Sequence, residues 1–374
     1  MSFQKKPIVL AEGVWADQEH SACLAVLREG IEKKAFPSAA VAIGRGRDTY
    51  LSAVMGHKTT QPSLEEADKN TLYDMASLTK LMSTTMVALR LIEQGKLLLS
   101  DPLTMYFSSD ELKNAPVDRE KVTVFQLMTH TSGITPHLPL WTVTKDPTEA
   151  VEAILASPAV CDRGAQVYYS CMGYILLQNI LERITGEGLD VLAKRMVFDP
   201  LRMRHTTYKP TCDQVATTEY STMRNCYIKG EVHDENAHYL GGVSGNAGVF
   251  STLDDCARFA AMLSCRGNTA YGRFLSESAF SLAVKNYTPG LSEARGLGFQ
   301  LKPPMPALSA MGDLMSEGSF GHTGFTGTSL YVDAKTGLWV VLLTNAVHYG
   351  RDKTAFFRYR RLLHNAAVGE FDRI

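Results

Sequence analysis

The stretch Leu72-Tyr73-Asp74-Met75-Ala76-Ser77-Leu78-Thr79-Lys80 runs directly into a long apolar pattern with helical spacing. Apolar residues recur from Leu78 to Ile92, and Gly95 is a typical residue for the end of a helix. Because these residues lie nearly all round the helix, we expect it to be central and buried. Asp74 is the expected N-cap.

Ser77 and Lys80 are three residues apart, so they would share one face of this helix, with the lysine amine close to the serine hydroxyl. A serine hydroxyl is a poor nucleophile until a neighbouring group takes its proton. The spacing alone is weak evidence, because Ser2-Phe3-Gln4-Lys5 also matches it without any helical pattern around it. The helical pattern around Ser77 and Lys80 makes this pair the stronger candidate for a catalytic serine and lysine.

The composition excludes several classes of protein. The chain has 374 residues, of which 45% are hydrophobic and 21% charged, as in an ordinary soluble globular protein. Lys and Arg (38) nearly balance Asp and Glu (39), which argues against nucleic acid or an anionic membrane as the main partner. No apolar run approaches the length of a membrane span, and Leu338–Leu343 is typical of a buried strand.

The expected compartment is the cytoplasm. Residues 1–7 have basic side chains but no apolar core or small-residue cleavage site after them, so we expect no signal peptide. The seven cysteines are scattered, without a C-x-x-C pair or zinc-type spacing, which fits a reducing compartment. The oligomeric state stays open.

Strands are predicted at both chain ends and helices between them. Two hairpins are expected, from Ala39–Ile43 with Thr49–Val54 and from Thr328–Val332 with Leu338–Thr344. The order predicts an α/β (α+β) fold, in which an antiparallel sheet is flanked by helices and carries an inserted, mostly helical domain. The expected domains are 1–75 plus 241–374 for the sheet and 76–240 for the helices, with the active site at their interface. Helices are expected at 124–130, 150–155, 174–185, 254–263 and 353–365.

Three clusters line up along the chain: Ser77-Leu78-Thr79-Lys80, Tyr169-Ser170-Cys171 and His322-Thr323-Gly324. With their surroundings they resemble the serine β-lactamase and penicillin-binding superfamily, in its class C-like branch. That branch includes the family VIII carboxylesterases and peptidases that release D-amino acids. The resemblance runs over most of the chain and implies the β-lactamase/transpeptidase-like fold. It also covers Leu127–Gly133, Gly173-Tyr174, Gly248–Thr252 and Gly321–Gly327.

The resemblance implies that Ser77 is the acylated nucleophile, Lys80 its proton partner and Tyr169 the general base or proton shuttle. A lysine ammonium beside a tyrosine favours the phenolate, while burial would lower the pKa of the lysine. Such a coupled set titrates as a unit, so the base is either Tyr169 or Lys80. Tyr168 is an adjacent competitor, but the spacing to Gly173-Tyr174 favours Tyr169.

The same resemblance also predicts the residues that contact the substrate and those that form the oxyanion hole. His322, Thr323, Gly324 and Cys171 would contact the substrate, and the backbone N–H groups of Ser77 and Phe325 would form the oxyanion hole. Gly324 would let the substrate approach the strand closely. His130 is expected only to support the short helix that ends near Gly133.

Two departures from the family pattern shape the functional expectation. Many relatives have asparagine where this chain has Cys171, and β-lactamases usually have lysine where it has His322. A thiol is a weak partner for an amide, and neutral histidine is a weaker partner than lysine for a carboxylate. We therefore expect a carboxylesterase for small acyl esters. The alternatives are a β-lactamase or D-alanyl/D-amino peptidase of the same fold and, from another class, a non-catalytic scaffold or sensor.

No cofactor or metal is expected. His233-Asp234-Glu235 with His238 lacks the spacing of a known zinc motif, so a polar loop at the rim of the site is the preferred interpretation. The G-x-S-x-G elbow of α/β-hydrolases is also absent from the sequence.

Overall fold

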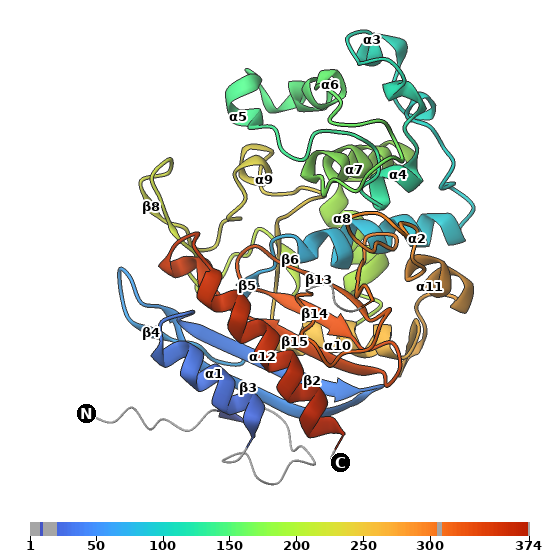
Figure 1. Cartoon of the computed structure of the whole chain (residues 1–374). Coiled ribbons are helices and arrows are strands. Elements are labelled where there is room, and N and C mark those ends of the chain that lie inside the picture. Colours follow the sequence, from blue (N-terminus) through green and yellow to red (C-terminus); the bar gives the residue numbers. More distant parts are fainter. Residues whose placement is uncertain (1–7, 10–20, 305–308, 373–374) are drawn as a thin grey trace.

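A computed structural model describes residues 8–9, 21–304 and 309–372 (Figure 1). Residues 1–7, which bear on the signal peptide and contain the second Ser-x-x-Lys match, lie outside the described residues. The main sheet is antiparallel throughout and draws its strands from both ends of the chain, which confirms the predicted fold class. Its order is β1 (Ile8–Val9), β3 (Asp48–Thr59), β2 (Ser38–Arg45), β15 (Leu338–Leu343), β14 (Ser329–Val332), β13 (Phe320–Thr323) and β12 (Gln300–Leu301), with β4 (Glu65–Glu66) paired to β3.

Strand β15 shows why the sheet core is continuous. Its six residues are all buried because successive side chains point to opposite faces, and both faces are covered. Trp339, Val341 and Leu343 belong to one hydrophobic core, and Leu338, Val340 and Leu342 belong to the other. An unbroken apolar run is therefore the expected sequence for this strand.

Helices cover both faces of the sheet. Helices α1 (Ala22–Glu32) and α12 (Thr354–Phe371) pack against each other across one face, in front of the strands in Figure 1. Helix α10 (Leu253–Ser264) packs against β2, β14 and β15 on the other face. Helix α12 extends six residues beyond the predicted end at 365.

A mostly helical layer lies above the sheet in Figure 1. Helix α7 (Cys171–Thr185) is its longest α-helix and ends at Gly186, whose φ of 72° fits a glycine stop. The other helices of this layer are α2 (Met86–Glu93), α3 (Ser109–Leu112), α4 (Val124–Met128), α5 (Leu140–Val143), α6 (Ala150–Ala156), α8 (Leu189–Ala193), α9 (Glu235–Tyr239) and α11 (Glu277–Ala283), with single turns η2 (Leu103–Met105), η3 (Arg119–Lys121) and η4 (Pro147–Glu149). The single turn η6 (Ala346–Tyr349) follows β15 of the main sheet.

Short strands connect the two layers. A three-stranded sheet of β5 (Tyr73–Asp74), β9 (Val249–Ser251) and β6 (Thr207–Tyr208) lies directly before Ser77. Two small hairpins, β7 (Tyr220–Ser221) with β8 (Cys226–Tyr227) and β10 (Asn268–Thr269) with β11 (Gly272–Arg273), complete the described strands. Within the described part of the chain, no helix is long and apolar enough to cross a membrane.

The helix that follows Ser77 differs from the prediction in two ways. After Leu78 and Thr79 it continues in wide π-helical turns, η1 (Lys80–Thr85), before the α-helix α2 starts at Met86. A second π segment, η5 (Lys194–Phe198), follows α8. The prediction of Asp74 as N-cap was wrong. Asp74 belongs to β5, and its carboxylate accepts a hydrogen bond from the N–H of Ala76, at 2.7 Å, in a tight turn before the helix.

Candidate active site

Ser77 and Lys80 meet as their spacing predicted. Lys80 is fully buried, and its Nζ donates hydrogen bonds to Ser77 Oγ at 3.0 Å and to the carbonyl of Asn246 at 3.0 Å. Its third partner is Cys171 Sγ, at 3.4 Å. An ammonium has three N–H donors, and here all three point at acceptors. The contacts therefore describe a charged lysine, which leaves Ser77 free to donate its own proton elsewhere.

Burial does act to lower the pKa of Lys80, as expected, but the net shift is upward. Desolvation does oppose the charged form, but the negative charge that Cys171 and Tyr169 acquire on ionisation outweighs it and raises the pKa of Lys80. The amine is therefore held as an ammonium at neutral pH. It provides a fixed positive charge beside the Ser77 hydroxyl.

Tyr169 lies over the same ammonium. The Nζ of Lys80 is 4.8 Å from the centroid of the Tyr169 ring. Desolvation raises the pKa of Tyr169, although the Lys80 charge and the Ser77 hydroxyl act in the opposite direction. Its Oη is buried and makes no hydrogen bond of good geometry within the described chain. Catalytic hydrogen bonds often tighten only when substrate is bound, so Tyr169 is a neutral phenol near Ser77 with an uncommitted oxygen.

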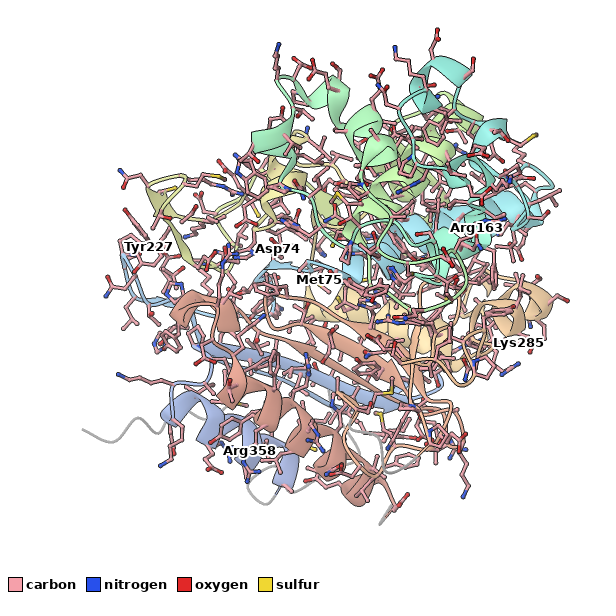
Figure 2. The ribbon with its side chains drawn as sticks, turned by 45° about the horizontal axis from the view of Figure 1, so that its top comes forward. Asp74, Met75, Arg163, Tyr227, Lys285 and Arg358 are labelled. Carbon is pink, nitrogen blue, oxygen red and sulfur yellow. The ribbon has the colours of Figure 1, made fainter. Side chains whose placement is uncertain are left out.

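The turn after β13 packs against the residues that precede Ser77. Thr326 Oγ1 donates to the carbonyl of Asp74 at 2.7 Å, and Thr328 Oγ1 donates to the carbonyl of Met75 at 3.2 Å. Figure 2 shows Asp74 and Met75 between the sheet and the helical layer. A Cβ at Gly324 would lie 2.5 Å from the Met75 carbonyl oxygen, so only glycine allows this close approach.

Two backbone donors are available at this junction. The N–H groups of Ser77 and Phe325 form none of the hydrogen bonds found within residues 21–304 and 309–372. Both belong to the segments that Thr326 and Thr328 hold together. A pair of fixed, unused donors beside a nucleophile is the arrangement that stabilises a developing oxyanion.

His322 is neutral and presents an acceptor. Its Nδ1 lies 2.7 Å from the carbonyl of Thr323, which requires a proton on Nδ1 and leaves Nε2 as the acceptor. Burial, followed by the charges of Arg295 and Lys80, lowers the pKa of His322 to about 3. The ring lies 5.6 Å from that of Tyr169. Thr323 is half-buried at the end of the same strand.

Three residues of this site were missed from the sequence. Asn246 contributes its backbone carbonyl to Lys80, and the Gly-rich stretch 241–248 was its only signal. His130, expected to support a helix, instead accepts the N–H of Ser170 at 3.0 Å, and its ring lies 4.6 Å from that of Tyr169. Arg295 is buried with its guanidinium 5.3 Å from the Tyr169 ring, and nothing in its sequence neighbourhood indicates this.

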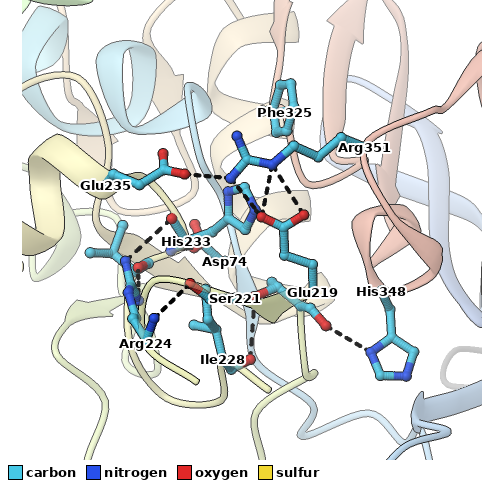
Figure 3. Close-up of polar contacts among 12 residues, drawn as sticks. Asp74, Glu219, Ser221, Arg224, Ile228, His233, Glu235, Phe325, His348 and Arg351 are labelled. Atoms are coloured by element: carbon cyan, nitrogen blue, oxygen red, sulfur yellow. Dashed lines mark hydrogen bonds and ion pairs between the residues drawn. The ribbon is translucent and has the colours of Figure 1, made fainter. Parts of the chain in front are cut away.

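The residues considered for a metal are used in other contacts. His233 Nε2 lies 2.9 Å from Glu219 Oε1, and the carboxylate of Glu219 also binds Arg351 (Figure 3). His238 lies 3.5 Å from Glu231. Among the described residues, no cluster of three histidine, cysteine or acidic side chains could hold a metal ion.

The buried histidines predict how stability depends on pH. Burial, followed by nearby Arg295 or Arg360, lowers the pKa of His322 and of His364 to about 3 and that of His130 well below its ordinary value. Their unfolded pKa is near 6.5, so the stability present above about pH 6.5 is lost as pH falls. For each of the three histidines, the free energy of unfolding should fall by about 1.4 kcal/mol per pH unit below about pH 6.5. Urea unfolding between pH 7 and pH 5 measures it.

A matched variant separates the histidines from other groups. His364 lies outside the site, and His364→Leu removes one of these three histidines. The fall in unfolding free energy with pH should then become less steep by about a third. A free energy of unfolding that stays constant from pH 7 to pH 5 would contradict the prediction.

Comparison with known proteins identifies the family of the chain. The profile of the family described as Beta-lactamase matches residues 24–364. The chain is 28% identical over 348 residues to an "N-acetylmuramyl-L-alanine amidase" of Bacillus subtilis (strain 168), covering 84% of this chain and 78% of that protein. It is 30% identical over 312 residues to a "Putative D-alanyl-D-alanine carboxypeptidase" of Escherichia coli (strain K12), covering 76% and 71%. The chain therefore belongs to the beta-lactamase family.

Solved structures show the same fold at low sequence identity. EstCE1, described as "a hydrolase with promiscuous acyltransferase activity", superposes with a TM-score of 0.74 at 19% identity, over 93% of this chain and 98% of that chain. A penicillin-binding protein homologue from Caulobacter crescentus also gives a TM-score of 0.74, at 16% identity, over 97% and 99%.

Proposed function

We propose that this protein is a serine hydrolase of the carboxylesterase type, which cleaves small acyl esters through an acyl-Ser77 intermediate. The observation that carries the proposal is the buried Lys80 ammonium on Ser77 Oγ, beside two unused backbone N–H donors. The assignment to the family VIII branch is part of the proposal. The fold shared with EstCE1 is compatible with it.

The charges suggest how the residues act. Ser77 Oγ attacks the ester carbonyl carbon and passes its proton to Tyr169 Oη, while the Tyr169 proton goes to the leaving alcohol. Tyr169 thus acts as a shuttle and needs no prior ionisation, in keeping with its raised pKa. The Lys80 ammonium stabilises the negative charge that develops on both oxygens. The N–H groups of Ser77 and Phe325 bind the carbonyl oxygen, and water later releases the acyl group by the same route.

The surroundings favour an ester over a β-lactam. Cys171 Sγ already contacts Lys80 and is a weak partner for a substrate amide. His322 carries no positive charge with which to bind a carboxylate. Thr323 ends the same strand and Gly324 follows it directly, and both would contact the acyl chain. A neutral acyl ester needs none of the missing groups.

One observation favours a second function, release of a C-terminal D-amino acid. Arg295 is 4% exposed beside Tyr169; its Nη2 pairs with the carboxylate of Glu293, while its Nε and Nη1 have no hydrogen-bond partner in the described chain. A buried guanidinium of this kind attracts a carboxylate. The Escherichia coli relative is itself described as a putative D-alanyl-D-alanine carboxypeptidase.

We also propose a cytoplasmic location. All seven cysteines are free thiols, which supports a reducing compartment. We further propose a small-molecule substrate, because the near balance of basic (38) and acidic (39) residues argues against nucleic acid or an anionic membrane.

The experiment compares four substrates with one preparation: p-nitrophenyl acetate, p-nitrophenyl butyrate, a chromogenic cephalosporin and a D-alanyl-D-alanine peptide. Fast ester turnover with slow cephalosporin opening and slow peptide cleavage is the expected result. Faster cephalosporin opening would make the protein a β-lactamase, and faster peptide cleavage would make it a peptidase. A fluorophosphonate probe should label Ser77, and failure of both labelling and turnover would favour a non-catalytic scaffold or sensor.

A further inference from the structure

Phe325 carries one of the two candidate oxyanion donors, yet packing in the core does not hold it. It lies in the turn between β13 and β14, and its side chain is 45% exposed. An oxyanion donor is effective only when its N–H is held at the position that the oxygen will occupy. Other contacts must therefore position this residue.

Lys353 makes the closest of these contacts. It directly precedes α12 and is 6% exposed. Its Nζ donates a hydrogen bond to the carbonyl of Phe325 and lies 3.2 Å from the centroid of the Phe325 ring. No carboxylate of the described residues forms an ion pair with Lys353. This buried amine is thus directed at the turn and not at an acidic partner.

A second group of residues contacts the same ring. The His233 ring stacks on the Phe325 ring with centroids 5.6 Å apart and planes 24° apart. His233 is fixed in turn by Glu219 through its ring and by Asp74, which accepts its backbone N–H at 2.7 Å. Figure 3 shows Phe325 next to this network, with Arg351 bridging Glu219 and Glu235.

We infer that Lys353 is a positioning residue for the hydrolysis, whose amine holds the Phe325 turn so that the Phe325 N–H stays aimed at the oxyanion. The inference rests on the proposed function, since it needs an oxyanion to form. Among the described residues, no hydrogen bond joins Lys353 to Ser77 or Lys80, so its effect passes through the turn. The substrate contacts remain those of Ser77, Phe325 and the β13 strand.

Burial of this amine is unfavourable, which separates positioning from a stabilising role. Desolvation first, and then Arg360 and Arg351, lowers the pKa of Lys353 to about 7, while Glu219 acts in the opposite direction. Replacing a lone buried amine by an apolar side chain of similar length removes the unfavourable desolvation of its charge. Loss of the Lys353 amine should therefore affect the rate and leave the stability unchanged or higher.

The test compares Lys353→Met with Lys353→Arg, which keeps a donor, and with Lys335→Met, an exposed lysine in the β14–β15 turn. Concentrations are normalised by fluorophosphonate titration of Ser77. Lys353→Met should lower kcat for p-nitrophenyl butyrate about 10- to 100-fold, with little change in KM. A boronic acid that forms a tetrahedral adduct on Ser77 should bind more weakly by a similar factor. Lys353→Arg should recover part of both, and Lys335→Met should match wild type.

Two outcomes would contradict the inference about Lys353 without contradicting the proposed function. One is an unchanged kcat and boronate affinity in Lys353→Met. The other is a fall in melting temperature while kcat per titrated Ser77 stays at the wild-type value, which would show a merely structural role. Absence of Ser77 labelling and turnover in wild type is a different result, because it removes the proposed function and this inference with it.

Discussion

Ser77→Ala is expected to lower kcat/KM for p-nitrophenyl butyrate by about 10⁴-fold or more, because no acyl-enzyme can form without the Ser77 oxygen. The backbone should not change, since alanine keeps the Cβ and the Ser77 N–H. Lys80 would lose one of its three acceptors and keep Asn246 and Cys171. Ester turnover and fluorophosphonate labelling, measured together, check the prediction.

Ser83→Ala is the matched control for this variant. Ser83 lies in the same helix, but its hydroxyl accepts from Tyr208 at 2.9 Å and not from Lys80. Its loss should change stability slightly and leave ester turnover within a few-fold of wild type. If Ser77→Ala hydrolysed the ester as fast as Ser83→Ala, the nucleophile would be another group.

Lys80→Met is expected to lower kcat/KM for the same ester by about 10³-fold. Methionine has a similar length, so the buried space stays filled, but the positive charge beside Ser77 Oγ and Tyr169 is lost. Charge stabilisation inside a water-excluded site accounts for a reduction of this size. The Asn246 carbonyl would lose its donor, so a small loss of stability is also expected. Steady-state kinetics and thermal unfolding measure the two effects.

Lys96→Met provides the comparison, because Lys96 follows the end of the same helix and is exposed. It should behave as wild type in both measurements. A Lys80→Met rate within tenfold of wild type would mean that Tyr169 activates Ser77 without the ammonium, and the charge argument would fail.

Local patterns predicted much of the fold. The apolar runs and turn residues of the two hairpins placed β2, β3, β14 and β15 correctly, because strand preference and turn chemistry act over a few residues. The Ser77–Lys80 spacing predicted a contact that the structure shows at 3.0 Å. The π-helical turns at Lys80–Thr85 were not predicted, because apolar spacing does not distinguish neighbouring hydrogen-bond registers.

The electrostatics of the site could not be predicted in the same way. The raised pKa of Lys80 depends on Cys171, 91 positions away, and on Tyr169. The sequence suggested burial, which by itself would lower that pKa. Asn246, His130 and Arg295 reach Lys80 or Tyr169 from separate loops, and their roles follow from where those loops pack.

The sequence by itself thus determined the residue types of the site, the hairpins and helices that carry them, and the family to which they belong. Only the tertiary structure decided the charge state of Lys80, the free N–H groups of Ser77 and Phe325, and the contact of Lys353 with the Phe325 turn. The physical reason is distance along the chain. Periodicity and capping act within a few residues, whereas desolvation and charge depend on every group brought within a few ångströms, whatever its sequence position.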